Sequence, residues 1–200
     1  RRVPMVEPED LAAVRGQRRA RLALEIAAAG GHHLLFSGPP GSGKTMLARC
    51  LPGVLPDLVE SEQLDVARAR AAAGRSPHLS TRPPLRTPHH SATPAAILGG
   101  GSGVPVPGEL TLADRGVLFL DELAEFPPYV LDSLRQPIEE GVVHVARKGT
   151  SVSFPARVQL VAATISENVF CSSLKSSMPL RSFSSHFASR VLPSVSDQPR

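Results

Sequence analysis

Apolar positions along the chain follow two different periods, and their alternation predicts an α/β protein. Apolar runs at 34–36 and 117–120, and the run 158–163, which is apolar except for Gln159, are typical of strands buried on both faces of a parallel sheet. Apolar residues in 17–29 instead recur at helical spacing, which predicts a helix with one core face that ends at Gly30-Gly31. Helices that alternate with apolar strands predict a parallel sheet flanked by helices.

Weaker helical patterns occur in three further segments. We expect a helix at 61–73 with Ser61 as its N-cap, and a short helical turn at 109–114. The pattern at 129–140 also predicts a helix, interrupted near Pro137 because proline breaks the helical hydrogen-bond pattern.

Two segments do not fit the alternation of strand and helix. The runs 142–147 and 151–154 flank a Lys-Gly-Thr turn, which predicts a β-hairpin inserted before the last core strand. The stretch 74–108 is rich in proline, glycine, serine and histidine, so we expect a long irregular insertion that is either functional or disordered. Its adjacent His89 and His90 should point apart, and no second ligand group has suitable spacing, so a metal site is not expected there.

Composition narrows the class of protein. With 200 residues and 42% hydrophobic content, the chain can bury one core of ordinary size. We expect a cytoplasmic location because no apolar stretch approaches the ~20 residues of a membrane span and no signal-peptide pattern opens the chain. Since it begins at Arg1 without a methionine, we expect a piece of a longer protein. Cys50 and Cys171 are far apart, so neither a disulfide framework nor a cysteine metal site is indicated.

The net charge of +4 and the pI near 9.7 are compatible with binding to nucleic acid but do not by themselves indicate it. Few aromatic residues are interleaved with the basic ones for base stacking. The first arginine cluster, at 15–21, is interpreted as a solvated helix face. The second, at 68–86, lies in a segment where a pore-facing or DNA-facing loop is conceivable.

The most informative motif is a glycine-rich loop between the first strand and a helix. It spells G-x-x-x-x-G-K-T, whose backbone N–H groups curl round a phosphate at the positive end of the helix. We expect Lys44 to contact the β- and γ-phosphate oxygens of ATP and to act in catalysis, and Thr45 to be a ligand of Mg²⁺. The expected nucleotide-binding residues are Gly38, Pro39, Pro40, Gly41, Ser42, Gly43, Lys44, Thr45 and Met46.

A pair of carboxylates ends the apolar run at 117–120. In a parallel sheet the ligand lies beyond the carboxyl ends of the strands, so Asp121 and Glu122 should emerge beside the glycine-rich loop. We expect Asp121 to hold Mg²⁺ through water, and Glu122 to orient and deprotonate the attacking water as the catalytic base. The chain is thus expected to be an ATPase.

These motifs resemble the AAA+ ATPase module of the magnesium-chelatase-like family of the ComM and YifB type, over about 4–164. The residues that carry the resemblance are Leu11 to Gln17, the phosphate loop, Arg86 to Ser91, Gly99 to Ser102, Pro107 to Glu109, Gly116 to Leu123, Leu131 to Pro137 and Pro155 to Arg157. The resemblance implies a P-loop NTPase fold, ATP hydrolysis in a homo-oligomeric ring that is commonly hexameric, and DNA as a partner in the ComM branch. The hairpin then resembles an insertion that faces the pore, and Arg147 and Lys148 at its tip suit a phosphate backbone or an ordinary exposed turn.

The chain departs from the family pattern after Thr164. The family places a sensor asparagine next, whereas this chain has Ile165, and Asn168 comes three residues late. We expect 1–164 to form an incomplete ATPase core and 165–200 a divergent, irregular tail without the lid domain. A shifted reading frame or an unrelated fused tail would explain it, and weak turnover in isolation is expected.

Three alternatives to an ATPase that acts on DNA remain open. A magnesium-chelatase subunit would use the same core to drive metal insertion into a porphyrin. A σ54-dependent activator would carry a GAFTGA-like loop between the two nucleotide motifs, which this chain lacks. A degenerate fragment would bind nucleotide without efficient hydrolysis.

Overall fold

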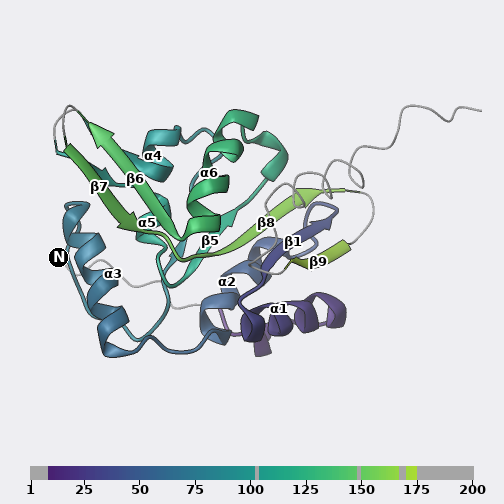
Figure 1. Ribbon diagram of the computed structural model, residues 1–200. Coiled ribbons are helices and arrows are strands. Elements are labelled where there is room, and N and C mark those ends of the chain that lie inside the picture. The colour runs from purple at the N-terminus through teal and green to yellow at the C-terminus, as the bar shows by residue number, and fades with distance from the viewer. Residues whose placement is uncertain (1–8, 102–103, 148–149, 167–169, 175–200) are drawn as a thin grey trace, which may run out of the picture.

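The computed structural model describes residues 9–101, 104–147, 150–166 and 170–174. A five-stranded sheet forms its centre, in the order β2-β5-β8-β1-β9 (Figure 1). Its strands are β1 (His33–Gly38), β2 (Leu85–Arg86), β5 (Val117–Leu120), β8 (Gln159–Ile165) and β9 (Phe170–Leu174). The first four pair in parallel, and β9 pairs antiparallel with β1. The predicted parallel sheet flanked by helices is confirmed.

Successive side chains of the central strands pack into two separate hydrophobic cores, because they point to opposite faces of the sheet. Leu34 and Phe36 pack with helices α1 (Arg18–Gly30) and α2 (Lys44–Val54) on one face. Leu35 points to the other face and belongs to the core that also contains the buried residues of α6 (Pro128–Glu140). Figure 1 shows α1 and α2 below the sheet and α6 above it. This double burial explains why the strands have nearly unbroken apolar sequences.

The described residues of the segment 74–108 include several short elements, so this stretch is not one irregular insertion. It contains β2, α4 (Pro94–Leu98), β3 (Gly99–Gly100) and β4 (Val106–Pro107), and is followed by α5 (Glu109–Leu112). Glu109 anchors it by accepting hydrogen bonds from Arg75, at 2.9 Å, and from Arg86. Burial alone would raise the pKa of Glu109, but the hydrogen bonds and charges of Arg86 and Arg75 outweigh it and lower the pKa.

Two expected helix details are wrong. Helix α3 (Glu60–Ala72) begins one residue earlier than expected, and its N-cap is Val59 rather than Ser61, with the Glu62 carboxylate accepting a hydrogen bond from the Val59 amide at 3.1 Å. Helix α6 is not interrupted but runs through Pro137. Its apolar face spans the proline, with Val130, Leu134 and Ile138 all buried in the core, and this packing outweighs the lost hydrogen bond.

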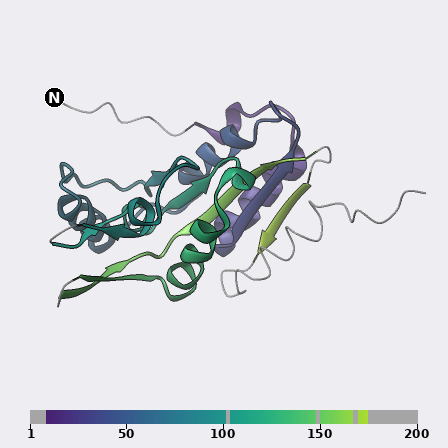
Figure 2. The same cartoon turned by 90° about the horizontal axis from the view of Figure 1, so that it is seen from above.

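The predicted hairpin is confirmed as β6 (Val142–Arg147) and β7 (Thr150–Pro155), which pair antiparallel. Two 3₁₀ turns, η1 (Leu11–Ala13) and η2 (Leu123–Glu125), complete the elements. Strand β9 was not expected from the sequence, and Figure 2 shows it beside β1.

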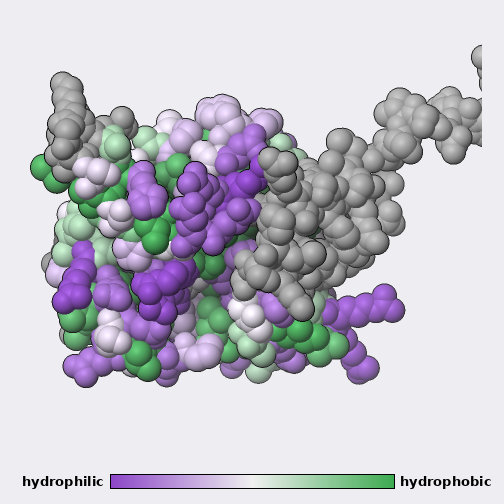
Figure 3. Space-filling model, viewed as in Figure 1, coloured by the Kyte–Doolittle hydropathy of each residue, from purple (hydrophilic) through white to green (hydrophobic). Residues whose placement is uncertain are grey.

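Hydrophilic side chains cover much of the face seen in Figure 3, with hydrophobic ones scattered between them. Within the described ranges, no helix has both the length and the apolar character needed to cross a membrane.

Candidate functional site

The glycine-rich loop connects the buried strand β1 to the first turn of α2. Gly41 and Gly43 have φ angles of 72° and 78°, which residues with a side chain rarely adopt. The Ser42 amide donates to the Pro39 carbonyl at 3.3 Å and tightens the loop. Because the first N–H groups of a helix have no partner within it, the start of α2 presents hydrogen-bond donors at this loop.

The Lys44 ammonium lies inside this loop. Its Nζ donates to the carbonyl oxygens of Gly38 at 2.8 Å and Pro39 at 2.9 Å, and reaches the Ser42 hydroxyl at 3.3 Å. These contacts hold the positive charge of Lys44 inside the loop. The side chains of Pro39, Pro40 and Met46 are exposed at its rim.

The two expected motifs meet in the structure. Thr45 Oγ1 donates to Asp121 Oδ2 at 2.8 Å, although the residues are 76 positions apart. The contact arises because α2 follows β1, Asp121 follows β5, and both strands point the same way on either side of β8. Two oxygen ligands of the kind that Mg²⁺ prefers are therefore side by side.

Glu122 leaves the sheet in a different direction from Asp121. Its φ angle is 50°, and its amide donates to Asp121 Oδ1 at 3.0 Å. Its side chain is 57% exposed, and Oε2 lies 3.4 Å from His90 Nδ1. The expectation that His89 and His90 point apart is wrong, since their rings lie 4.0 Å apart between centroids. The turn after Pro88 brings the neighbouring side chains to one side.

Gln17 also reaches the loop, a contact that sequence reasoning missed. Its side-chain amide donates to the Ser42 carbonyl, and it precedes α1 with a φ angle of 48°. A Cβ at Gly43 would lie 2.8 Å from Gln17 Nε2, so this glycine leaves room for the amide. The Gly16-Gln17 pair directly before a predicted helix was the available signal.

Comparison with known proteins assigns the chain to a family. The family model described as "Magnesium chelatase, subunit ChlI" matches residues 10–184. The chain belongs to this magnesium chelatase family. Competence protein ComM of Haemophilus influenzae and the YifB protein of Escherichia coli are each 51% identical to it over 156 residues, which is 77% of the chain. The chain spans only 30% and 31% of the length of those two relatives.

A solved structure shows the same fold. The complex between subunits BchI and BchD of magnesium chelatase contains a chain that aligns with a TM-score of 0.56 and 24% sequence identity. The alignment covers 83% of this chain and 55% of that one. The fold of this family member is therefore the AAA+ P-loop type expected from the sequence.

The sensor position of the family pattern is only partly described. Thr164 is buried and pairs with Ser37 in the sheet, while Ile165, which occupies the expected asparagine position, is 57% exposed. Asn168 lies outside the described residues. So do Lys148 and the side chain of Arg147 at the hairpin tip.

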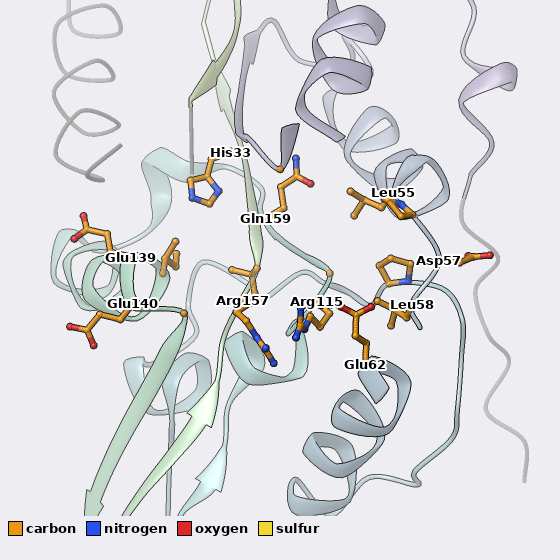
Figure 4. Close-up of a pocket in the computed structure, with 17 residues that line it drawn as sticks. His33, Leu55, Asp57, Leu58, Glu62, Arg115, Glu139, Glu140, Arg157 and Gln159 are labelled. Atoms are coloured by element: carbon orange, nitrogen blue, oxygen red, sulfur yellow. Dashed lines mark ion pairs between the residues drawn. The ribbon is translucent and has the colours of Figure 1, made fainter. Parts of the chain in front are cut away.

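This family member has a pocket of about 630 Å³ at the opposite edge of the sheet, at the amino ends of the strands (Figure 4). Arg115 pairs there with Glu62 at 3.0 Å, and Arg157 with the buried Asp114 at 3.1 Å. His33 also lines it, and burial, with a smaller contribution from His32, lowers the pKa of His33 to about 4. The phosphate loop lines no part of this pocket.

No group of three or more His, Cys, Asp or Glu side chains placed to hold a metal ion occurs in the described part of the chain. The Thr45 and Asp121 pair still fits Mg²⁺, which is often bound by one or two protein oxygens together with substrate phosphates and water.

Proposed function

We propose that this chain is the ATP-binding module of an AAA+ ATPase that couples ATP hydrolysis to the remodelling of a macromolecule. The observation that carries the proposal is the contact between Thr45 and Asp121, which joins the phosphate loop to the acidic strand end. Family membership supports it. In this proposal residues 1–164 form the ATPase core and 165–200 a divergent tail.

Residues 38–46 would bind ATP or ADP, with the loop amides and the Lys44 ammonium against the phosphate oxygens. Thr45 and Asp121 would hold Mg²⁺, which supplies positive charge that screens the phosphates during transfer. The Glu122 carboxylate takes a proton from water as the water oxygen bonds to the γ-phosphorus. The bond from that phosphorus to the β,γ-bridging oxygen breaks, and ADP leaves with inorganic phosphate.

Turnover by this chain alone should be weak. Neither an arginine finger nor a lid domain can be assigned among the described residues, and an arginine finger alone is worth ~10³ to 10⁵ in rate. We therefore place efficient hydrolysis in a homo-oligomer, with a hexameric ring as the proposed form.

DNA is the proposed macromolecule, with support from the ComM relative and the excess of basic residues. A magnesium-chelatase role is the second candidate, favoured by the description of the matching family model. ATP hydrolysis measured with branched DNA and with a porphyrin separates them, on this chain and on a version with a complete family C-terminus. Stimulation by DNA alone supports the first role, and stimulation by porphyrin alone the second.

Two variants test the nucleotide site itself. Lys44→Ala should weaken binding of a fluorescent ATP analogue roughly 10- to 100-fold, because it removes a charged hydrogen-bond donor. Glu122→Gln should keep this affinity and lower turnover ~10²- to 10⁴-fold, as loss of a general base does. Arg49→Ala is the matched control, since Arg49 lies on α2 and pairs with Glu9 at the surface. Unchanged affinity in Lys44→Ala would refute the proposal.

A further inference from the structure

The stretch 66–108 carries positive charge that the nucleotide site does not use. It contains five arginines and three histidines but no aspartate or glutamate, and also no phenylalanine, tyrosine or tryptophan. Three of the arginines come together from different elements, since Arg70 lies on α3, Arg86 on β2 and Arg75 in the connection between them. These three side chains form what we call the guanidinium cluster.

Glu109 is the carboxylate around which the guanidinium cluster forms. Its Oε1 accepts a hydrogen bond from Arg75 Nη2 at 2.9 Å, and its Oε2 accepts one from Arg86 Nε. Arg70 has no carboxylate partner among the described residues, and its Nε donates to the Ser76 carbonyl at 3.3 Å. Burial lowers the pKa of Arg70, and the nearby charges of Arg75 and Arg86 lower it further. Three mutually repelling positive charges therefore surround one negative charge.

Each guanidinium group of the cluster keeps donors for a ligand. The contacts with Glu109 and Ser76 engage one nitrogen of each arginine, whereas a guanidinium carries five N–H donors in a planar fork that matches phosphate oxygens. The side chains of Arg75 and Arg86 are 39% and 25% exposed, so a ligand can reach them. Because the cluster is already assembled on α3 and β2, binding would order little of the chain.

The guanidinium cluster lies apart from the phosphate loop. Strand β2 stands at one edge of the sheet, and β5 and β8 separate it from β1, which leads into that loop. Helix α3 lies at the opposite end of the molecule from α1 in both Figure 1 and Figure 2. A second phosphate-binding surface at the cluster could therefore be occupied while ATP is bound.

We propose that the guanidinium cluster binds the phosphate backbone of double-stranded DNA. Backbone phosphates neutralised by the cluster would relieve the repulsion among its arginines and release counterions, which drives binding. Such contacts position a protein on DNA without reading its sequence. The lack of aromatic side chains in 66–108 disfavours single strands, whose bases stack on such groups. This inference rests on the DNA part of the proposed function, for which it names the contact surface.

The first test is the binding of a fluorescein-labelled DNA duplex, measured by anisotropy between about 50 and 200 mM salt. Arg70→Ala should weaken binding roughly three- to tenfold and reduce the salt slope by about one, because one phosphate contact is lost. Arg70→Lys keeps the charge and should recover most of the affinity. Arg19→Ala is the matched control, since Arg19 is exposed on α1 and its loss changes the net charge equally. Equal effects of Arg70→Ala and Arg19→Ala refute the inference.

Glu109→Gln gives a second test with the opposite sign. The amide has nearly the shape of the carboxylate but no charge, so the guanidinium cluster becomes more positive. Binding of the duplex should then strengthen roughly two- to tenfold, whereas damage to the fold would weaken it. Unchanged or weaker DNA binding by a Glu109→Gln protein that still binds the ATP analogue contradicts the inference. If this variant does not fold, the two Arg70 variants decide.

Competitors identify the class of partner. A duplex of unrelated sequence should displace the labelled one equally well, whereas polyglutamate and a single strand of the same length should compete more weakly. Equal competition by polyglutamate or by the single strand overturns the inference, since it assigns the guanidinium cluster to an acidic protein or to single strands.

The ATP analogue separates this inference from the proposed function. If the chain binds the analogue but no DNA, the inference fails while the ATP site stands. If DNA binds through Arg70 and the analogue does not bind, the ATPase proposal fails and the guanidinium cluster stands.

Discussion

Thr45 shows how much of the candidate site depends on single atoms. Its hydroxyl donates a hydrogen bond to Asp121 Oδ2 at 2.8 Å. Valine has nearly the same shape without the oxygen, so Thr45→Val removes the proposed metal ligand and little else. The Mg²⁺-dependent part of ATP affinity should fall roughly tenfold, and Thr45→Ser should retain it.

This prediction is checked by titrating a fluorescent ATP analogue in Mg²⁺ and in EDTA. The difference between the two conditions should shrink in Thr45→Val and persist in Thr45→Ser. An equal response to Mg²⁺ in the wild type and Thr45→Val would contradict the assignment of this hydroxyl.

His33 makes stability depend on pH. Its Nδ1 accepts a hydrogen bond from the Leu160 amide at 3.0 Å, and its pKa is about 4 instead of the ordinary 6.5. Between these values the unfolded chain binds the proton and the folded protein does not. Stability is therefore complete above pH 6.5 and falls as the pH drops toward 4, by about 3 kcal/mol on the scale of ~1.4 kcal/mol per pKa unit.

Urea unfolding at pH 7 and at pH 5 measures this effect. The wild type should lose stability at pH 5, and His33→Gln, which does not titrate in this range, should lose less. Equal losses in the two proteins would show that another group causes the pH dependence.

At the scale of elements, the sequence predicts best those segments whose signals are local. The glycine-rich loop, the buried strands and the β6–β7 hairpin each carry their own pattern. Strand β2 does not, because two residues, Leu85 and Arg86, become a strand only by pairing with β5. Helix α6 was expected to break at Pro137, because burial of its apolar face cannot be weighed from the sequence alone.

The N-cap of α3 offers a test at this scale. Val59 has the extended backbone of an N-cap but no side-chain oxygen to accept a hydrogen bond from the first turn. Val59→Ser should raise the free energy of unfolding by about 1 kcal/mol, the typical contribution of a serine cap. Ser61→Ala should change it little, since Ser61 lies inside the helix. A larger loss in Ser61→Ala than gain in Val59→Ser, measured by urea unfolding, would restore Ser61 as the cap.

At the scale of the whole molecule, topology brings the candidate site together. Parallel strands predict that Thr45 and Asp121 converge, and the structure confirms their contact. The contacts of His90 with Glu122 and of Gln17 with the loop were missed, because each depends on how a connecting segment folds back over the sheet. The catalytic and binding roles of these residues stay predictions.

Arg157 lies just before β8 and forms an ion pair with Asp114 in the turn before β5. Asp114 is buried and accepts hydrogen bonds from the Arg157 amide at 2.8 Å and from two nitrogens of its guanidinium. Arg157→Ala removes both guanidinium hydrogen bonds from this buried carboxylate, so it should lower the free energy of unfolding by about 2–3 kcal/mol. Arg68→Ala is the control, since Arg68 pairs with Asp65 at the surface and should lose less than ~1 kcal/mol. Equal losses in the two variants would refute the structural role of Arg157.

Strand β9 has a consequence for how the molecule behaves in solution. Its backbone is matched to β1 from His33 and Leu174 at one end to Ser37 and Phe170 at the other. Without it, β1 would be an exposed edge strand with unpaired backbone amides and carbonyls, to which strands of other molecules can pair. Strand β9 thus covers this edge of the sheet, and a chain that ends before residue 170 should aggregate, which light scattering would measure.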